Sequence, residues 1–523
     1  MTATRHLARA GLIVSAAFLA SRVLGWVRTI VIVRSGGSLA ELDAFFAAFR
    51  IPDLIFQLVA AGALSSALIP IVSGLFATDE HPRAWRVVST VTNLVLLALL
   101  GLGLVVLIAA PAIVEFITPG FDAAQTAKTV ELTRIMMLSP IFLALGAVAT
   151  SVLNAGGRFA ASAVAPVTYN LAIIGAALLL TPSMGVDGLA IGVVIGSFCH
   201  LLVQLRPLAR LGFRYVPKID IGDAVARKAL TLMAPRAVGL GATQITFVVV
   251  TSLATLQGPG AVTSFNVAFT LLQIPIGVIG VPLGIVVLPS LSRVAAIGRE
   301  PEFVAMLTRA LRLLVYVMVP IGALFAIVRV ETVSLLFDDG SYGDAALTLT
   351  AATLFAFLVG LAAHALIAVL ARAFYARQDT LTPVLAAVGA VVINVSLAVM
   401  LVGPLGLPGV ALAIAIAAWM EAIVLILVLT RRVPGFTPSP LLSVGLASAV
   451  GTVIASAAGL IVRGMLERTI GPDPGKLLLA LEIALTSLAF GLVYAGVSLA
   501  LRIPELPSIV GVMVDVIRRP RPS

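Results

Sequence analysis

Long apolar runs recur along the whole chain, and each is long enough to cross a lipid bilayer as an α-helix. A spanning helix needs about 20 predominantly apolar residues, because it rises about 1.5 Å per residue through a hydrocarbon core about 30 Å thick. We place fourteen such runs, at residues 9–33, 42–76, 85–110, 129–153, 160–181, 187–208, 224–256, 261–294, 303–328, 346–374, 382–402, 408–430, 440–463 and 477–501. The sequence therefore predicts an all-α polytopic membrane protein with about fourteen transmembrane helices.

The charge content agrees with a membrane protein and argues against nucleic-acid binding. Only 11% of the 523 residues are charged, whereas soluble globular proteins carry about 25%. The net charge of +10 comes from basic residues in short loops between apolar runs, which membrane orientation explains. The N-terminus resembles a signal peptide, but the apolar sequence continues to Val33, so we expect an uncleaved first helix.

The loop charges predict the orientation in the membrane. Basic residues concentrate in alternate loops, for example Arg83 and Arg86 in one and Arg377 in another, whereas an intervening loop carries Asp338 and Asp344. Cytoplasmic loops are the ones enriched in lysine and arginine. We therefore expect both termini in the cytoplasm and an even number of spans.

An internal repeat predicts two related lobes. GALSSALIPIVS at 62–73 aligns with VPLGIVVLPSLS at 281–292, and a second pair of segments aligns with a similar offset of about 220 residues. Six helices per repeat would make the two copies parallel and place a binding site between them. The predicted domains are an N-terminal lobe at 1–210, a C-terminal lobe at 211–432, and two further helices with a short basic cytoplasmic tail at 433–523.

The first two helices carry charges inside otherwise apolar sequence. Arg22, Arg28, Arg50 and Asp53 lie within segments that are apolar enough to span a bilayer. A charge at the centre of a spanning helix costs about 2.5–3.5 kcal/mol on insertion scales, so such residues usually face a cavity or a partner. We interpret them as the floor of an anion-binding cavity. The alternative is that the arginines reach the membrane interface or pair with Asp43 and Asp53.

The run at 261–294 is rich in prolines. Pro275, Pro282 and Pro289 follow one another at intervals of seven residues. Each proline removes a backbone hydrogen bond and favours a kink. We interpret this helix as one that bends to open a cleft to alternate sides of the membrane, with static irregular packing as the alternative.

No catalytic constellation is present in the sequence. The four histidines are scattered, and there is no HExxH motif, nucleophile elbow or P-loop. We therefore expect a protein that is not an enzyme and needs no cofactor or metal. Glu421 and Glu482 lie inside predicted helices; Glu421 is a candidate for carrying coupling protons, with pairing inside its own lobe as the alternative.

Several motifs together resemble one family. SRVLGWVRTIVIVR at 21–34, DAFFAAFRIPD at 43–53 and FYARQDTLTP at 374–383 resemble the MurJ/MviN family of flippases for the lipid-linked peptidoglycan precursor. The resemblance implies fourteen helices in two six-helix lobes and a central cavity bordered by helices 1, 2, 7 and 8. It also implies a groove beside helices 13 and 14 for a polyprenyl tail, in the bacterial cytoplasmic membrane.

The resemblance also implies roles for individual residues. Arg22 and Arg28 match the family's functional arginines and would bind the diphosphate of lipid II or a related polyprenyl-diphosphate saccharide. We add Arg50 as an assisting cation because of its own position in the second helix, not because of the resemblance. Arginine's planar fork of donors suits such an anion. Asp43 matches an acidic residue of the family and would latch or release the arginines, with Asp53 also assigned to gating or coupling. The prolines of the eighth helix would allow the movement.

The sequence departs from the family at the cationic site. Family arginines in helices 2 and 8 align with Phe56, or Gln57 in a shifted register, and with Thr270. Two alternatives to lipid II flipping therefore stay open: export of another polyprenyl-diphosphate saccharide or a drug, and a non-transporting scaffold that binds cell-wall synthesis proteins. With no nucleotide-binding motif, an ion gradient or the membrane potential is the expected driving force.

Overall fold

The computed structural model describes residues 2–59, 63–338, 342–470 and 475–507, and this part of the chain contains helices and no strands. Internal contacts divide the chain into two compact units. The first runs to Asn266, and the second begins at Val267, apart from a short segment around Tyr342 that belongs to the first. The predicted lobe boundary at residue 210 follows the sequence repeat, and it stays a prediction.

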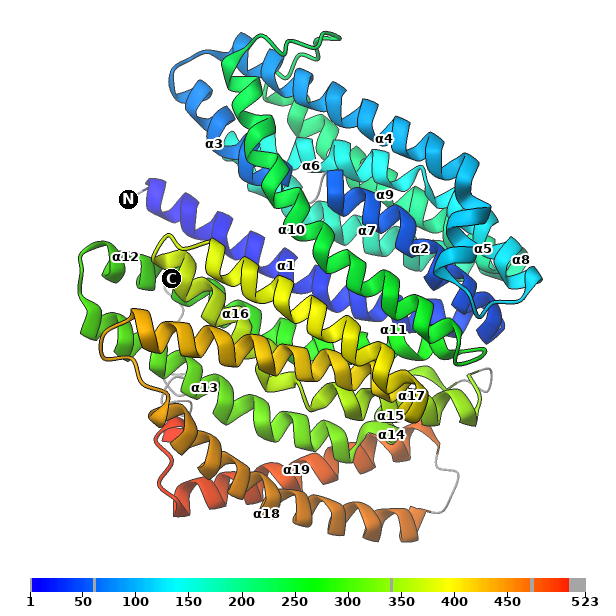
Figure 1. The fold of residues 1–523 in the computed structure, drawn as a ribbon, viewed down its shortest axis with the longest axis vertical. Helices are drawn as coiled ribbons and strands as arrows, with labels where there is room; N and C mark the ends of the chain where they lie inside the picture. The colour runs from blue at the N-terminus through cyan, green and yellow to red at the C-terminus, as the bar shows by residue number, and fades with distance from the viewer. Residues whose placement is uncertain (1, 60–62, 339–341, 471–474, 508–523) are drawn as a thin grey trace. The chain divides into compact units, whose positions relative to one another are not determined.

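The first unit contains ten helices in its described residues. They are α1 (Thr2–Ser35), α2 (Leu39–Val59), α3 (Ala63–Ala77), α4 (His81–Ile117), α5 (Ala123–Met136), α6 (Ser139–Ala155), α7 (Phe159–Leu179), α8 (Thr181–Met184), α9 (Val186–Arg210) and α10 (Ala224–Thr255). Within this unit α1 packs against α7, and α10 packs against α2, α3 and α4 (Figure 1). These α10 contacts place the helix with the first unit.

The second unit takes in most of α11 and the elements that follow it. They are α11 (Ala261–Pro275), the π-helix η1 (Ile276–Gly280), α12 (Val281–Ala296), α13 (Glu300–Ile327), α14 (Arg329–Phe337), α15 (Asp344–Leu358), α16 (Leu361–Ala376), α17 (Leu381–Arg432), α18 (Ser439–Ile470) and α19 (Lys476–Ala500). Here α18 and α19 lie side by side, and α13 packs against α18 (Figure 1).

Each of the fourteen predicted runs has a helical counterpart, with differences where helices break. Ten helices of the described part are long and apolar enough to span a membrane, and the pair α15–α16, bent by 45°, makes an eleventh. The long α17 holds two of the predicted runs, because Gly406 with a φ of 61° breaks it between Pro404 and Pro408. The runs at 42–76 and 224–256 correspond to α2–α3 and to α10. The architecture is that of a polytopic membrane protein with about fourteen spans.

The side-chain pattern of α19 shows how these helices suit a lipid environment. Leucines at every seventh position are exposed, whereas polar Glu482 and Thr486 are buried. The exposed leucines are Leu478, Leu485, Leu492 and Leu499. A stripe with period seven stays on one face of a helix. An exposed apolar face on this scale is favourable against lipid tails and not against water, so α19 presents this face to the bilayer.

The proline-rich helix predicted at 261–294 is interrupted by a π-helical turn. Pro275 and Pro282 flank the π-helix η1, and the Val281 N–H donates to the Ile276 carbonyl five residues earlier. Because Pro282 has no N–H, it cannot continue the α-helical ladder, and the chain accommodates an extra residue in this turn. The predicted irregularity is confirmed. Its role in movement stays a prediction.

Glycines bring the irregular helix close to α16. A Cβ at Gly280 would lie 3.2 Å from the Cβ of Ala365, and one at Gly284 would lie 2.9 Å from the Ala368 carbonyl oxygen. Only glycine allows the two backbones to approach this closely at Gly284, because the contacted atom is backbone and cannot move independently. The interrupted helix therefore has a close, glycine-dependent contact with α16 in the second unit.

Candidate functional site

Helix α2 begins with a capping box, which defines the start of the helix. The Ser38 N–H donates to the Glu41 carboxylate at 3.0 Å, and the Glu41 N–H donates to the Ser38 hydroxyl at 3.3 Å. These reciprocal bonds satisfy donors that the first turn of a helix leaves without partners. From this start Asp43 and Arg50, seven residues apart, fall on nearly the same face of α2. That face meets α10 and the start of α11.

Asp43 is fully buried and caps the N-terminus of α11. Its carboxylate accepts hydrogen bonds from the Gly260 N–H at 2.6 Å, from the Thr263 N–H at 2.7 Å and from the Thr263 hydroxyl at 2.6 Å. A carboxylate is favourable here because the N-terminus of a helix carries partial positive charge and free N–H groups. The Asp43 side chain, which lies on α2, thus contacts the start of α11, and no ion pair between it and an arginine is found in the described residues. Its latching role stays a prediction.

Arg50 is held by neutral groups. Its Nε–H donates to the Thr251 hydroxyl at 3.1 Å, and its Nη2–H donates to the Asn266 side-chain oxygen at 2.7 Å. The guanidinium also lies over the Phe247 ring, 5.1 Å from the centroid. A guanidinium has five N–H donors, so two bonds leave three donors available. Arg50 is therefore oriented by its neighbours without being neutralised by a direct ion pair.

Arg28 and Asp53 belong to the same polar cluster. Asp53 interacts electrostatically with both Arg50 and Arg28 and accepts a hydrogen bond from Gln244 at 3.0 Å. The Arg28 guanidinium lies over the Tyr169 ring of α7, 5.8 Å from its centroid. Its Nε is buried and has no hydrogen-bond partner in the described part of the chain. A buried donor without a partner costs about 1–3 kcal/mol, which an oxygen atom of a ligand would recover.

Arg22 lies apart from this cluster along the same helix. Its guanidinium contacts the Phe18 ring at 5.3 Å from the centroid. Six residues of helix separate it from Arg28, which corresponds to about 9 Å of rise and a different face. The structure therefore brings together Arg28, Arg50 and Asp53 and records no contact between Arg22 and these three. Pro275, Pro282 and Pro289 belong to the second unit.

The three arginines have no carboxylate in direct contact, unlike seven other cations of the described part. Residues such as Arg83, Lys128, Arg312, Arg377 and Arg463 form direct ion pairs with carboxylates. No such ion pair to Arg22, Arg28 or Arg50 is found in the described part. A positive charge that is only partly balanced, among aromatic faces and neutral acceptors, is suited to attract an anion.

Sequence reasoning missed the neutral residues that orient these charges. Thr251 and Asn266 hold Arg50, Gln244 donates to Asp53, and Thr263 donates to Asp43. A signal was present, because Gln244 and Thr251 stand seven residues apart on one face of an apolar helix. Polar residues at that spacing in a spanning helix indicate an interior polar face.

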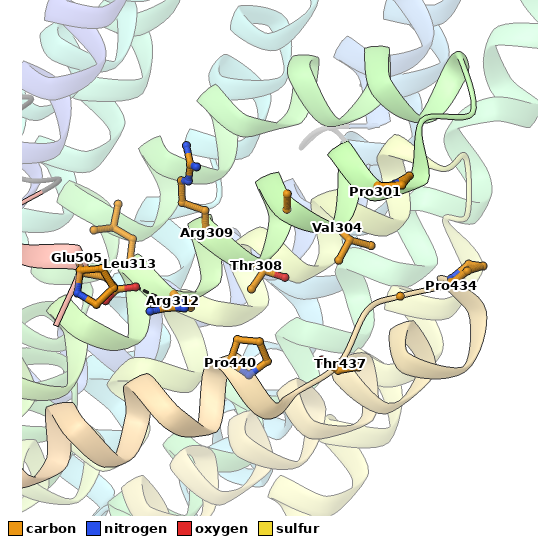
Figure 2. Close-up of a pocket in the computed structure, with 13 residues that line it drawn as sticks. Pro301, Val304, Thr308, Arg309, Arg312, Leu313, Pro434, Thr437, Pro440 and Glu505 are labelled. Atoms are coloured by element: carbon orange, nitrogen blue, oxygen red, sulfur yellow. Dashed lines mark hydrogen bonds and ion pairs between the residues drawn. The ribbon is translucent and has the colours of Figure 1, made fainter. Parts of the chain in front are cut away.

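A separate cavity of about 1130 Å³ lies in the second unit. It is lined by the first half of α13, by the segment between α17 and α18, and by Pro504 and Glu505 after α19. Figure 2 shows Arg312 beside Glu505 within this lining; the Arg312 Nε–H donates to Glu505 at 2.6 Å. Prolines and aliphatic residues form much of the remaining wall (Figure 2). A mostly apolar cavity that also carries Arg309 and the Arg312–Glu505 pair suits an amphipathic ligand.

Comparison with known proteins identifies the family. The model of the lipid II flippase MurJ family matches residues 35–481. The lipid II flippase MurJ of Burkholderia cenocepacia is 32% identical over 445 residues, which are 83% of this chain and 86% of that protein. The chain belongs to the lipid II flippase MurJ family. The probable lipid II flippase MurJ of Vibrio cholerae is 30% identical and aligns over 80% of this chain and 82% of its own length.

Solved structures support the fold of the MurJ family and of a wider group. The inward closed conformation of a lipid II flippase MurJ matches with a TM-score of 0.78 over 94% of this chain and 99% of that chain, at 22% identity. An inward-facing multidrug transporter of the MATE family in the MOP superfamily matches with a TM-score of 0.64 over 79% of this chain and 95% of that chain, at 18% identity. At these identities the matches establish the fold alone.

The two α2 positions that the resemblance offers for a family arginine, Phe56 and Gln57, have different surroundings. Gln57 donates to Asp53 at 3.5 Å, whereas Phe56 packs against the hydrophobic core of the first unit. The polar position is thus Gln57, one helical turn after Asp53. This chain has a neutral amide there, so Arg28 and Arg50 supply the positive charge of the cluster.

Proposed function

We propose that this protein moves lipid II, or a closely related polyprenyl-diphosphate saccharide, across the bacterial cytoplasmic membrane by alternating access. The observation that carries the proposal is the pair Arg28 and Arg50, which have unused N–H donors and no direct ion pair in the described residues. Diphosphate oxygens are matched by guanidinium groups in both charge and geometry. Arg22 would contact the same anion as it enters or leaves.

The remaining assignments extend this mechanism. Asp43 and Asp53 act in gating or coupling, and the π-helical turn between Pro275 and Pro282 allows the proline-rich helix to bend. The cavity near Arg312 receives part of the polyprenyl tail, because its wall is mostly apolar. Both termini face the cytoplasm. Transport involves no bond making or breaking by the protein, and an ion gradient or the membrane potential drives it.

Rescue of bacteria depleted of their own lipid II flippase tests the proposal. Wild-type protein should restore growth and externally accessible lipid II, and Arg28→Ala should restore neither. Arg158→Ala is the matched control, because it removes the same charge from an exposed residue of the first unit. Arg28→Lys should rescue partially, since lysine keeps the charge and loses the planar fork.

A reconstituted assay separates a wrong substrate from a missing host partner. Purified protein in vesicles should expose labelled lipid II to an external probe, and Arg28→Ala should not. Failure of wild-type protein in both assays, despite correct membrane insertion, would overturn lipid II flipping.

A second candidate rests on Gln57. A neutral amide beside Asp53, in a cluster that lacks the family's further arginine in helix 2, would suit export of a substrate with less negative charge, such as another lipid-linked saccharide. Transport of such a lipid that survives loss of both Arg22 and Arg28 would favour it. A scaffold that binds cell-wall synthesis proteins would instead show partner capture with no lipid movement.

A further inference from the structure

Three glutamates surround one arginine where three helices of the second unit meet. Glu331 lies on α14, Glu467 and Arg463 lie on α18, and Glu482 lies on α19. One carboxylate oxygen from each glutamate lies within 4.8 Å of those of the other two. Figure 1 shows α14, α18 and α19 gathered together, and α19 contacts both of the others. Residues distant in sequence thus form one acidic cluster.

The single arginine does not balance the cluster. The Arg463 Nη2 lies 2.6 Å from Glu331 Oε1 and 2.8 Å from Glu467 Oε1. Its Nη1–H donates to the Ile327 carbonyl at 2.9 Å. Three carboxylates against one guanidinium leave a formal excess of two negative charges. The arginine also fixes the positions of two of the carboxylates.

Two of the three glutamates are buried, whereas Glu467 is exposed. Glu482 is only 3% exposed, and Glu331 is 5% exposed. Glu482 Oε1 and Glu331 Oε2 are buried and have no hydrogen-bond partner within the described residues. A buried carboxylate oxygen without a partner is strongly unfavourable. The Glu482 side chain forms no ion pair in the described residues, and one of its carboxylate oxygens lies within 4.8 Å of an oxygen of each of the other two glutamates. This buried carboxylate without a partner indicates that the cluster binds a ligand.

The geometry points to a hard divalent cation such as calcium, bound by carboxylate oxygens. Calcium binds oxygen ligands at about 2.3–2.6 Å in flexible arrangements, so carboxylate oxygens that lie within 4.8 Å of one another can share one ion. Two positive charges also match the excess of two negative charges. We infer that Glu331, Glu467 and Glu482 bind such a cation, which ties α14 to the α18–α19 pair.

Equilibrium dialysis with radioactive calcium tests this site. The full-length protein, purified in detergent and stripped with chelator, should bind about one ion per chain with a dissociation constant between about 10⁻⁵ and 10⁻³ M. Glu482→Gln and Glu331→Gln should each weaken binding about tenfold or more, because affinity depends on the number of charged ligands. Glu421→Gln is the matched control, since it removes a carboxylate from α17 outside the cluster.

A second measurement separates lost binding from lost folding. Calcium should raise the thermal unfolding midpoint of wild-type protein and of Glu421→Gln, but not that of Glu482→Gln, when all three are helical and monodisperse. Absence of saturable calcium binding by wild-type protein would overturn the inference. So would equal affinity in Glu482→Gln and Glu421→Gln, or displacement of calcium by sodium at equal concentration.

Discussion

Removal of the Asp43 carboxylate should destabilise the first unit more than removal of any exposed acid on the same helix. Asp43 is fully buried and accepts three hydrogen bonds, two of them from backbone N–H groups at the start of α11. In Asp43→Ala these two N–H groups lose their acceptor. Because α11 begins at this point, no preceding turn of helix can replace the carboxylate.

The size of the effect follows from these bonds. Hydrogen bonds to a charged group contribute about 1.5–3 kcal/mol each, so three contribute at least about 4–5 kcal/mol. Removing the carboxylate also relieves the cost of burying its charge, which is several kcal/mol before compensation. We therefore expect Asp43→Ala to lower the free energy of unfolding by about 3 kcal/mol. Thr263→Val, which removes one of the three donors, should cost about 1–2 kcal/mol.

Reversible unfolding in mixed micelles, followed by tryptophan fluorescence, measures these values. Glu41→Ala is the control, because Glu41 forms an exposed capping box two residues earlier on α2, where loss of the cap costs about 1 kcal/mol. The double variant of Asp43 and Thr263 should cost less than the sum of the single variants, since they share one interaction. If Asp43→Ala costs no more than Glu41→Ala, the capping role is wrong.

Three further predictions concern other parts of the molecule. Gly284→Ala should lower the free energy of unfolding by about 1–3 kcal/mol, because the added methyl group overpacks the contact with α16. Gly389→Ala is the control and should not lower it, because no atom lies within 4 Å of a Cβ at that position. Chemical unfolding of the two variants measures the difference. Pro282→Ala restores an N–H in the irregular helix, so vesicle assays should show slower lipid transport with unchanged or higher thermal stability. The Arg83 guanidinium, which donates to Asp223, holds the pKa of that carboxyl below its ordinary value. A depressed pKa stabilises the fold above the unfolded-state pKa of about 3.9, and this contribution disappears as the pH falls through the folded-state pKa. The unfolding midpoint of wild-type protein should therefore fall more steeply below pH 4 than that of Asp223→Asn, and Asp220→Asn should behave like wild type.

The helices could be predicted from sequence because a bilayer imposes one strong constraint. A segment that crosses it must satisfy its own backbone hydrogen bonds, so every long apolar run becomes helical. The break between 402 and 408 was also predictable, since Pro404, Gly406 and Pro408 mark it. The break in the run at 346–374 could not be predicted from the sequence. Gly360 approaches Ala415 so closely that a Cβ there would lie 2.7 Å from the Ala415 Cα, and this contact depends on tertiary packing.

The charged residues of the candidate site could be predicted from the sequence, but their hydrogen-bond partners could not. Arg28 and Arg50 stood out because charged residues are rare inside apolar runs. The partners of Arg50 lie about 200 positions away in sequence and are neutral, so no charge pattern could indicate them. Asp43 was expected to latch or release the arginines, and that role stays a prediction. Its hydrogen bonds to the start of α11 could not be predicted, because local sequence around residue 43 carries no signal of a helix that begins at residue 261.

The choice of neutral partners for Arg50 has a consequence for anion binding. If a carboxylate held this guanidinium directly, an incoming diphosphate would have to displace that carboxylate and leave it buried without its partner, which costs about 3–5 kcal/mol. Thr251 and Asn266 orient Arg50 through two of its five N–H groups and leave three for a ligand. Replacing Asn266 by Asp should therefore keep the geometry of Arg50 and weaken binding of a diphosphate lipid. Replacing it by Ser should leave most of that binding intact. Binding of lipid II to the two purified variants distinguishes the cases, and equal affinities would show that Arg50 does not contact the diphosphate.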